Sequence, residues 1–245
     1  MIDVPRYLAA LNRCFPGWGD ERTFAWAFRG ADFIVEDEAG SAVTYRDVDN
    51  GTRAAIMTGS WTLPEARGRG HFSRIIEKSL ELARARDAAM LLAFVTASNA
   101  SRRRLEAAGA VMVPAFYCRS ERGRPARSEW SSRPVADGAR DGRAPVRFIY
   151  TEEEWRTQFL ERPRPTKQIS GEHWSAVVEP AEDHTRVHHI AGDFSAAIAS
   201  LGAVFFYTTV VSRAQGFDVT DGFLAVLPLR GDAIVDWDLQ NGDRV

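Results

Sequence analysis

Arginine and glycine alternate in the segment Arg67-Gly68-Arg69-Gly70, which stands directly before a helix-like pattern. Glycine lets the backbone approach a ligand closely, and arginine can bind a phosphate through two hydrogen bonds. The first N–H groups of a helix have no internal partner and lie at the positive end of the helix dipole. The segment therefore predicts a phosphate-binding loop at a helix N-terminus.

Two common phosphate loops do not fit this segment. The GxxxxGKS/T pattern of a Walker A loop is absent. The dinucleotide-binding fingerprint lacks its third Gly or Ala, and no acidic residue ends a strand about twenty residues later. The predicted phosphate loop must therefore be of another kind.

The elements that position the loop follow from the spacing of apolar residues. A strand is expected over residues 53–62, before the loop. A helix is expected over residues 72–86, because apolar side chains recur there at helical spacing: Phe72, Ile75, Ile76, Leu80 and Ala83. A strand buried on both faces over 89–95, a capped helix ending at Ala108 and a strand over 111–118 follow. This order predicts an α/β fold with parallel strands around the helix.

One stretch breaks the globular pattern of the chain. Residues 121–145 are rich in Arg, Gly, Ser, Pro and Ala and contain few large apolar side chains. Such a stretch is typical of a linker or a long surface loop. It divides the chain into a first domain, residues 1–120, and a second, residues 146–245. The second repeats the order strand, helix, strand in reduced form, which indicates an internal duplication.

Composition limits the compartment and the partners. The net charge is −2, which gives no overall attraction to nucleic acid or to anionic lipid. The cysteines, Cys14 and Cys118, have no metal-binding or disulfide spacing. The first residues lack the apolar core of a signal peptide, and no run approaches the roughly 18 apolar residues of a membrane span. We expect a cytoplasmic protein that binds neither nucleic acid nor membrane.

Residues 62–113 resemble the GNAT acyltransferase superfamily. The acyl-CoA loop of that family, R-x-x-G-x-G/A, is matched by the segment from Arg67 to Phe72. Its later Asn, followed by a helix that ends in Gly-Phe, is matched from Asn99 to Gly109-Ala110. The resemblance implies a GNAT fold, with a mixed central sheet flanked by helices, followed by a smaller GNAT-like α/β unit as in tandem members.

The resemblance also implies donor-binding residues. Backbone amides of the loop would hold the pyrophosphate of CoA: Arg67, Gly68, Arg69, Gly70, His71 and Phe72. The strand residues before the loop would pair with the pantetheine amides: Trp61, Thr62 and Leu63. Asn99 would lie near the pantetheine arm, and residues 94–96 would form the other wall of the thioester slot.

Two positions depart from the family pattern. The last Gly or Ala of the loop is Phe72, whose side chain can point into the core and leave its amide free. The tyrosine that protonates the departing thiolate in many members is Leu105, which cannot donate a proton. A free thiolate is still a tolerable leaving group, because the pKa of a thiol is about 8.5. Tyr117 is the candidate substitute.

The general base is less well defined by the sequence. Glu65 is the carboxylate nearest to the loop and is the leading candidate, with Asp47 and Asp49 as others. We expect no metal site, since His188 and His189 would point to opposite faces of one strand, beside His184.

The predicted function is acyl transfer from acyl-CoA, with acetyl-CoA as the expected donor, by direct attack of an amine on the thioester. The acceptor would be a small amine, an amino sugar or a natural-product intermediate. Two alternatives stay open: a catalytically weak acyl-CoA-binding sensor or assembly partner, and transfer from a carrier-protein thioester. The sequence does not decide between a monomer and a homodimer.

Overall fold

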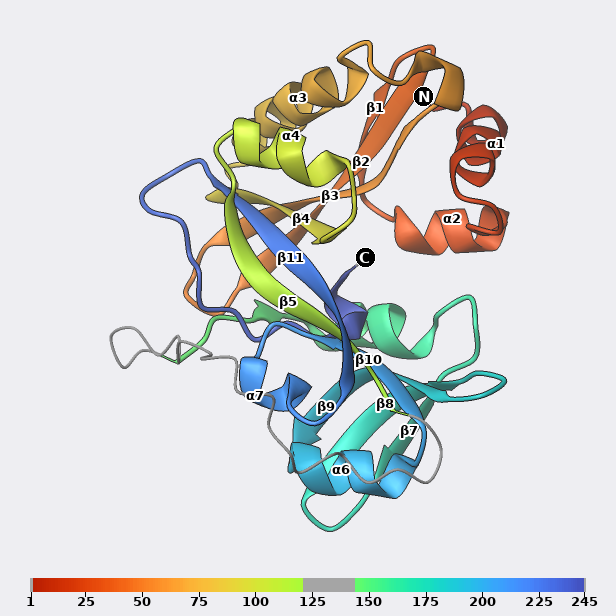
Figure 1. The fold of residues 1–245 in the computed structure, drawn as a ribbon, viewed down its shortest axis with the longest axis vertical. Helices are drawn as coiled ribbons and strands as arrows, with labels where there is room; N and C mark the ends of the chain where they lie inside the picture. Colours follow the sequence, from red (N-terminus) through yellow and green to blue (C-terminus); the bar gives the residue numbers. More distant parts are fainter. Residues whose placement is uncertain (1, 121–143, 245) are drawn as a thin grey trace. The chain divides into compact units, whose positions relative to one another are not determined.

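The computed structural model describes residues 2–120 and 144–244. Contacts divide the described chain into two compact units (Figure 1). Unit 1 takes the chain up to Met112 together with Leu224–Val235, and unit 2 takes Val113–Phe223 and Asp236–Arg244. Most of the predicted linker, residues 121–143, lies outside the described residues.

Unit 1 contains the predicted phosphate loop and the elements around it. Its elements are α1 (Val4–Cys14), α2 (Glu21–Ala27), β1 (Asp32–Val35), β2 (Ala39–Val48), β3 (Arg53–Thr62), a 3-10 turn (Pro64–Ala66), α3 (His71–Ala85), β4 (Met90–Thr96), α4 (Ser101–Ala107) and the end of β11 (Asp218–Pro228). In the view of Figure 1, α3 and α4 lie to one side of these strands, and α1 and α2 lie to the other.

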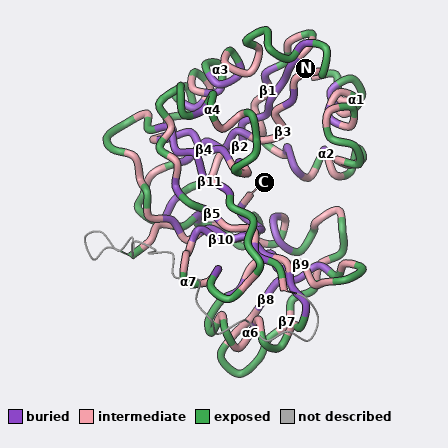
Figure 2. The backbone as a smooth tube through the Cα atoms, viewed as in Figure 1, coloured by how far each residue is buried: buried purple, intermediate pink, exposed green. Residues whose placement is uncertain are grey.

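The sheet of unit 1 is mixed. β1 pairs with β2 and β2 pairs with β3 in antiparallel fashion, whereas β3 and β4 run parallel. The predicted parallel pairing around the helix is therefore confirmed. Parallel strands need a crossover, and α3 supplies it while burying Ile75, Ile76 and Ala83. Figure 2 shows the buried residues of this unit gathered on its strands, and residues Met90–Ala93 are all buried.

A dense aromatic cluster fixes α1 and α2 to the sheet. Tyr7 lies at its centre, with the ring centroids of Phe24, Phe28, Phe33 and Trp61 between 5.5 and 6.0 Å away. All four contacts are edge-to-face, the arrangement in which the ring quadrupoles attract. The cluster therefore ties both helices to β1 and β3.

Unit 2 repeats the element order of unit 1. Its main elements are β5 (Val111–Arg119), β6 (Phe148–Ile149), α5 (Glu152–Trp155), a π-helical turn (Arg156–Leu160), β7 (Lys167–Ser170), β8 (Trp174–Pro180), β9 (Thr185–Gly192), α6 (Phe194–Leu201), β10 (Val204–Thr208), α7 (Val211–Ala214) and a 3-10 turn (Asn241–Arg244). β7, β8 and β9 pair antiparallel, and β9 and β10 pair parallel. The run β7-β8-β9-α6-β10-α7-β11 has the same order as β1-β2-β3-α3-β4-α4-β5.

The last strand of each run belongs, for most of its length or at its end, to the other unit. β5 from Val113 belongs to unit 2, where it pairs antiparallel with β10. β11 from Leu224 belongs to unit 1, and the N–H of Leu229 there donates to the carbonyl of Ala89 (2.8 Å). The contacts of residues 224–235, among them the hydrogen bonding beside β4, join them to unit 1, and the division of the chain into domains at residues 121–145 stays a prediction.

No helix in the described ranges is both long enough and apolar enough to cross a membrane.

Candidate functional site

The loop between β3 and α3 has the backbone geometry that its glycines predict. Gly68 has φ +83° and Gly70 has φ +80°, a region that side chains with a Cβ rarely adopt. Gly70 is the N-cap of α3, and no side chain caps this helix. The first turn of α3 is therefore left open to a ligand's acceptor atoms.

Most backbone N–H groups of the loop are free of protein partners. The N–H of Arg67 donates weakly to the carbonyl of Pro64 (3.4 Å). Within the described chain, no hydrogen bond engages the N–H of Gly68, Arg69 or Gly70. These amides and the first turn of α3 form a row of donors at the positive end of a 15-residue helix. Such a row can bind a phosphate or diphosphate.

Two carboxylates beside the loop are paired with basic side chains of the loop and of α3. Glu38 accepts hydrogen bonds from Arg69 (3.2 Å) and contacts Nε2 of His71 (3.3 Å). Glu36 pairs with Lys78 (2.9 Å) and contacts Nδ1 of His71 (3.2 Å). The Lys78 ammonium is the largest influence that lowers the pKa of Glu36 to about 2. The guanidinium of Arg69 is thus already paired, which the sequence did not indicate.

Arg67 differs from Arg69 in its surroundings. Its side chain is exposed, and no ion pair to it occurs among the described residues. Its charge reaches Cys14 at the end of α1: burial raises the pKa of that thiol, and Arg67 opposes the rise. Arg67 therefore lies within electrostatic reach of the end of α1, and its charge is available for an anionic ligand.

Two backbone groups of the strand end before the loop already have protein partners. Trp61 is buried in the aromatic cluster. The carbonyl of Thr62 accepts a hydrogen bond from Cys14 (3.4 Å), and the N–H of Leu63 donates to the carbonyl of Glu38 (2.9 Å). The parallel register of β3 with β4 ends at Met57–Ala93, although both strands continue. Beyond that pair, each strand has an edge toward the other.

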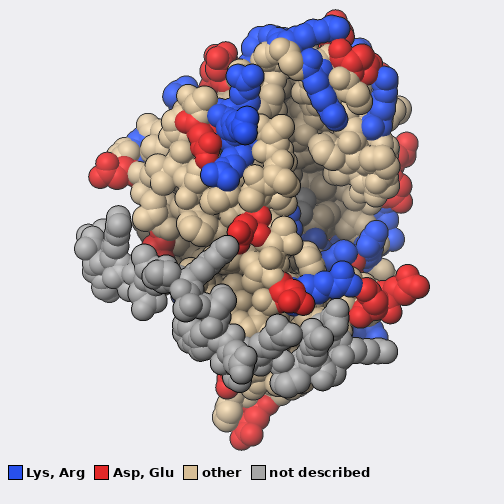
Figure 3. Space-filling model, in the orientation of Figure 1, with Lys and Arg blue, Asp and Glu red and all other residues tan. Residues whose placement is uncertain are grey.

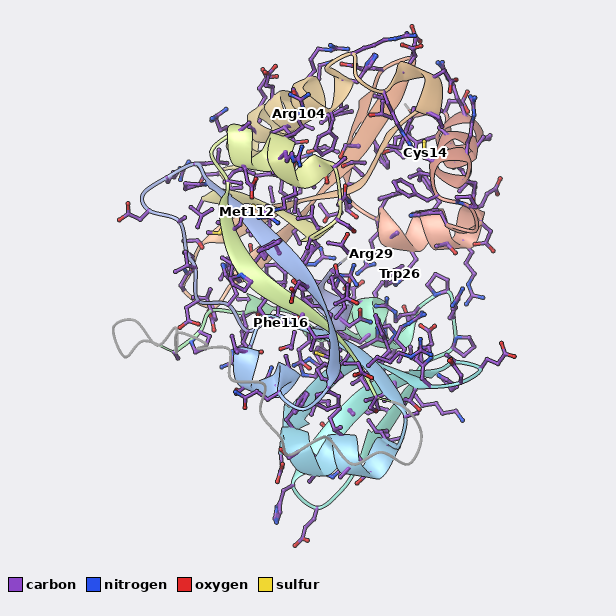
Figure 4. The ribbon with its side chains drawn as sticks, viewed as in Figure 1. Cys14, Trp26, Arg29, Arg104, Met112 and Phe116 are labelled. Atoms are coloured by element: carbon purple, nitrogen blue, oxygen red, sulfur yellow. The ribbon has the colours of Figure 1, made fainter. Side chains whose placement is uncertain are left out.

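A hollow in unit 1 lies next to these strand ends. Figure 3 shows it between α4 on one side and α1 with α2 on the other, with basic side chains along its rim. Figure 4 places Arg104 of α4 on one side of this hollow and Cys14 of α1 on the other. Arg104 is exposed, as is Arg67. The basic side chains on this rim favour an anionic ligand.

Asn99 performs a structural task at the start of α4. Its side-chain oxygen accepts hydrogen bonds from the N–H (3.0 Å) and the hydroxyl (2.7 Å) of Ser101. This fixes the first turn of α4, as expected for an Asn at a helix start. A contact with a ligand would have to use the amide nitrogen of Asn99.

The candidate catalytic residues, Glu65 and Tyr117, belong to different units. Glu65 is held by Arg13 (2.9 Å) at the surface of unit 1. Tyr117 lies on β5 in unit 2, where its ring contacts Tyr207 (5.2 Å) and the guanidinium of Arg244 (4.7 Å). Leu105 is fully buried and packs as a core residue. The roles of Glu65 and Tyr117 as base and acid stay predictions.

The histidines that suggest a metal site have separate partners. His184 pairs with Asp183 (2.6 Å), and His188 pairs with Glu179 (3.0 Å). His189 contacts Gln240 (3.3 Å). In residues 2–120 and 144–244, no three His, Cys, Asp or Glu side chains form a group that could hold a metal ion.

The sequence did not indicate three residues that the structure places in or beside the candidate site: Glu36, Glu38 and Tyr7. Glu36 and Glu38 flank the turn between β1 and β2, more than 30 residues before the groups that they bind. Tertiary folding brings this turn to the start of α3, and no local pattern in the sequence indicates that placement. Tyr7 had only its place on an apolar helix face as a signal.

The mixed sheet and its crossover helix have the fold of the GCN5-related N-acetyltransferases, so the predicted mixed α/β GNAT fold is confirmed, whereas the second GNAT-like unit stays a prediction. A solved structure from Kribbella flavida, a GCN5-related N-acetyltransferase, is 16% identical with a TM-score of 0.61, over 92% of this chain and 68% of that chain. Another from Anabaena variabilis is 13% identical with a TM-score of 0.60, over 91% and 70%. No protein-family model and no curated protein matches the sequence.

Proposed function

We propose that this chain is an acyl-CoA-dependent N-acyltransferase that binds its donor at residues 67–72. The observation that carries the proposal is the uncapped start of α3, where two glycines with positive φ leave a row of amides without partners. Arg67 adds an available positive charge beside them. A CoA diphosphate supplies the acceptor oxygens and the negative charge that this row would bind.

The proposed reaction is a direct transfer. The nitrogen of the acceptor attacks the thioester carbon, a C–N bond forms, the C–S bond breaks and CoA leaves as a thiolate. A base takes the proton that the amine loses. Glu65 stays the candidate base and Tyr117 the candidate acid. Holding the pantetheine arm along Trp61, Thr62 and Leu63 would supply much of the rate by orientation.

The finer identity of the reactants belongs to the same proposal. Acetyl-CoA is the proposed donor, and a small amine, amino sugar or natural-product intermediate is the proposed acceptor. We place the protein in the cytoplasm, and a metal ion has no part in the scheme.

Unit 2 is proposed to be a degenerate copy that binds no donor. β9 ends at Gly192 and α6 begins at Phe194, so Asp193 alone stands where unit 1 has its loop. The carboxylate of Asp193 accepts a hydrogen bond from the N–H of Ala196 (3.0 Å) and caps the helix. A negative charge at this position opposes phosphate binding. One donor site per chain follows.

The test is a calorimetric titration of the protein with acetyl-CoA, followed by thiol release with a panel of amines. We expect one binding site per chain and release of free CoA that depends on the amine. Absence of acetyl-CoA binding at millimolar concentration contradicts the proposal.

A second candidate function is acyl-CoA binding without efficient turnover. The burial of Leu105 favours it, because the position that often carries a proton donor is part of the core. Tight acetyl-CoA binding without thiol release across the panel supports this alternative. Release only with an acyl-carrier protein as donor supports transfer from a carrier thioester.

A further inference from the structure

β3 contains a bulge at the point where it leaves β4. The antiparallel register with β2 shifts between Gly40–Trp61 and Ala42–Thr58, so β3 carries one extra residue there. Gly59, in that interval, has φ +55°. The shift begins after Thr58, one residue beyond Met57, which is the last residue of β3 paired with β4. A bulge bends its strand, so this one sets the direction of the residues that lead to the loop.

Three groups from different elements hold the bulge. The Tyr7 hydroxyl of α1 donates to the carbonyl of Gly59 (3.3 Å). The Phe28 ring lies so close that a Cβ on Gly59 would approach its Cζ to 2.4 Å. On the other strand, the Ser41 hydroxyl forms a 2.7 Å hydrogen bond with that of Ser60. A bulge held in this way has little freedom to change its bend.

The hydroxyl of Tyr7 contacts the bulge at the carbonyl of Gly59 and also lies beside the Trp61 side chain. Its ring is 1% exposed and is enclosed by the aromatic cluster, where a phenylalanine ring would fill the same space. Phe24, Phe28 and Phe33 already occupy such places. Burial raises the pKa of Tyr7, so the phenol stays protonated and donates. The hydroxyl contributes a hydrogen bond to Gly59, and the ring accounts for the packing.

We propose that Tyr7 is a positioning residue for the acyl end of the donor, because its hydroxyl fixes the Gly59 bulge that directs Trp61–Leu63 along the slot. This inference rests on the proposed function. The diphosphate loop begins after Leu63, so the nucleotide half of CoA lies beyond the reach of the bulge. The pantetheine arm and the thioester run beside it.

The test compares Tyr7→Phe with the full-length wild-type chain, using two probes. Acetyl-CoA contains the pantetheine arm, and 3′-phosphoadenosine 5′-diphosphate is the nucleotide half without it. Tyr45→Phe is the matched control, since it also removes a hydrogen-bonded hydroxyl in unit 1, that of Tyr45 to Asp32 (2.8 Å). Calorimetry gives both dissociation constants, and thermal unfolding gives the midpoint for each variant.

We expect Tyr7→Phe to bind acetyl-CoA about five- to tenfold more weakly and the nucleotide as the wild type does. Both variants should lower the unfolding midpoint by about 2–4 °C, the effect of one lost hydrogen bond. Unchanged acetyl-CoA binding in Tyr7→Phe overturns the inference, and so does an equal loss for both probes. A wild type that binds neither probe instead refutes the proposed function.

Discussion

Gly70 is the residue on which donor binding depends most directly. With φ +80°, a valine there is strained, although its Cβ would meet only the Arg74 guanidinium at 3.7 Å. We expect Gly70→Val to fold and to lose acetyl-CoA binding, because the chain must turn its amides away to relieve the strain. Calorimetry measures the loss. Gly51→Val is the matched control, since Gly51 has φ +82° and open space around it, away from the loop. Equal affinity in both variants contradicts the assigned loop.

Glu38 is the residue that limits the charge available at the loop. Its carboxylate holds Arg69 and lies near the proposed diphosphate. Replacing Glu38 by Gln removes one negative charge and releases the guanidinium, so acetyl-CoA should bind about two- to fivefold more tightly at low salt. The gain should shrink as salt screens the charges. Asp37→Asn is the control, because Asp37 is the neighbouring carboxylate and is 96% exposed. Weaker binding in Glu38→Gln shows instead that the carboxylate supports the loop.

At the scale of elements, the two crossover helices start in opposite ways. α3 begins with an uncapped glycine, whereas α6 begins with Asp193, whose carboxylate satisfies the N–H of Ala196. We expect Asp193→Ala to lower the free energy of unfolding by about 1 kcal/mol and Asp193→Asn to change it little, since Asn caps equally well. Urea unfolding measures both. An Asp193→Ala variant with the same free energy of unfolding as the wild type would mean that the cap does not stabilise unit 2.

The start of α3 was predictable because its signals are local. Glycine angles, a missing cap and apolar spacing all act within a few residues. The cap of α6 also has a local signal in the sequence, because Asp193 stands directly before an apolar helical run. The bulge in β3 was not, because Gly59 and Ser60 look like ordinary strand residues until Tyr7, Phe28 and Ser41 are placed around them.

At the scale of the whole molecule, buried histidines make stability depend on pH. His189 packs against Trp155 and Phe159, and this burial lowers its pKa to about 4. Burial also lowers the pKa of His188, although Glu179 opposes the effect. Since a free histidine has a pKa of about 6.5, the unfolded chain binds protons between about pH 4 and 6.5 that native His189 does not. The free energy of unfolding therefore rises with pH across this window and falls as acid is added.

The measurement is urea unfolding at several pH values between 5 and 6.5. His189→Gln should reduce the slope by up to about 1.4 kcal/mol per pH unit, the value for one proton. His173→Gln is the control, because the His173 side chain is 77% exposed. An unchanged slope in His189→Gln excludes this residue as the source of the pH dependence.

The sequence by itself determined the α/β fold and the helix that follows the loop, and it predicted the chemistry of the loop. Each depends on spacing, capping or backbone angles over a few neighbouring residues. The tertiary structure decided the pairing of Arg69 with Glu38, the exchange of β5 and β11 between the units and the hydrogen bond from Tyr7 to Gly59. These features join segments more than 30 residues apart, so they depend on how the chain packs, and no local pattern specifies that packing.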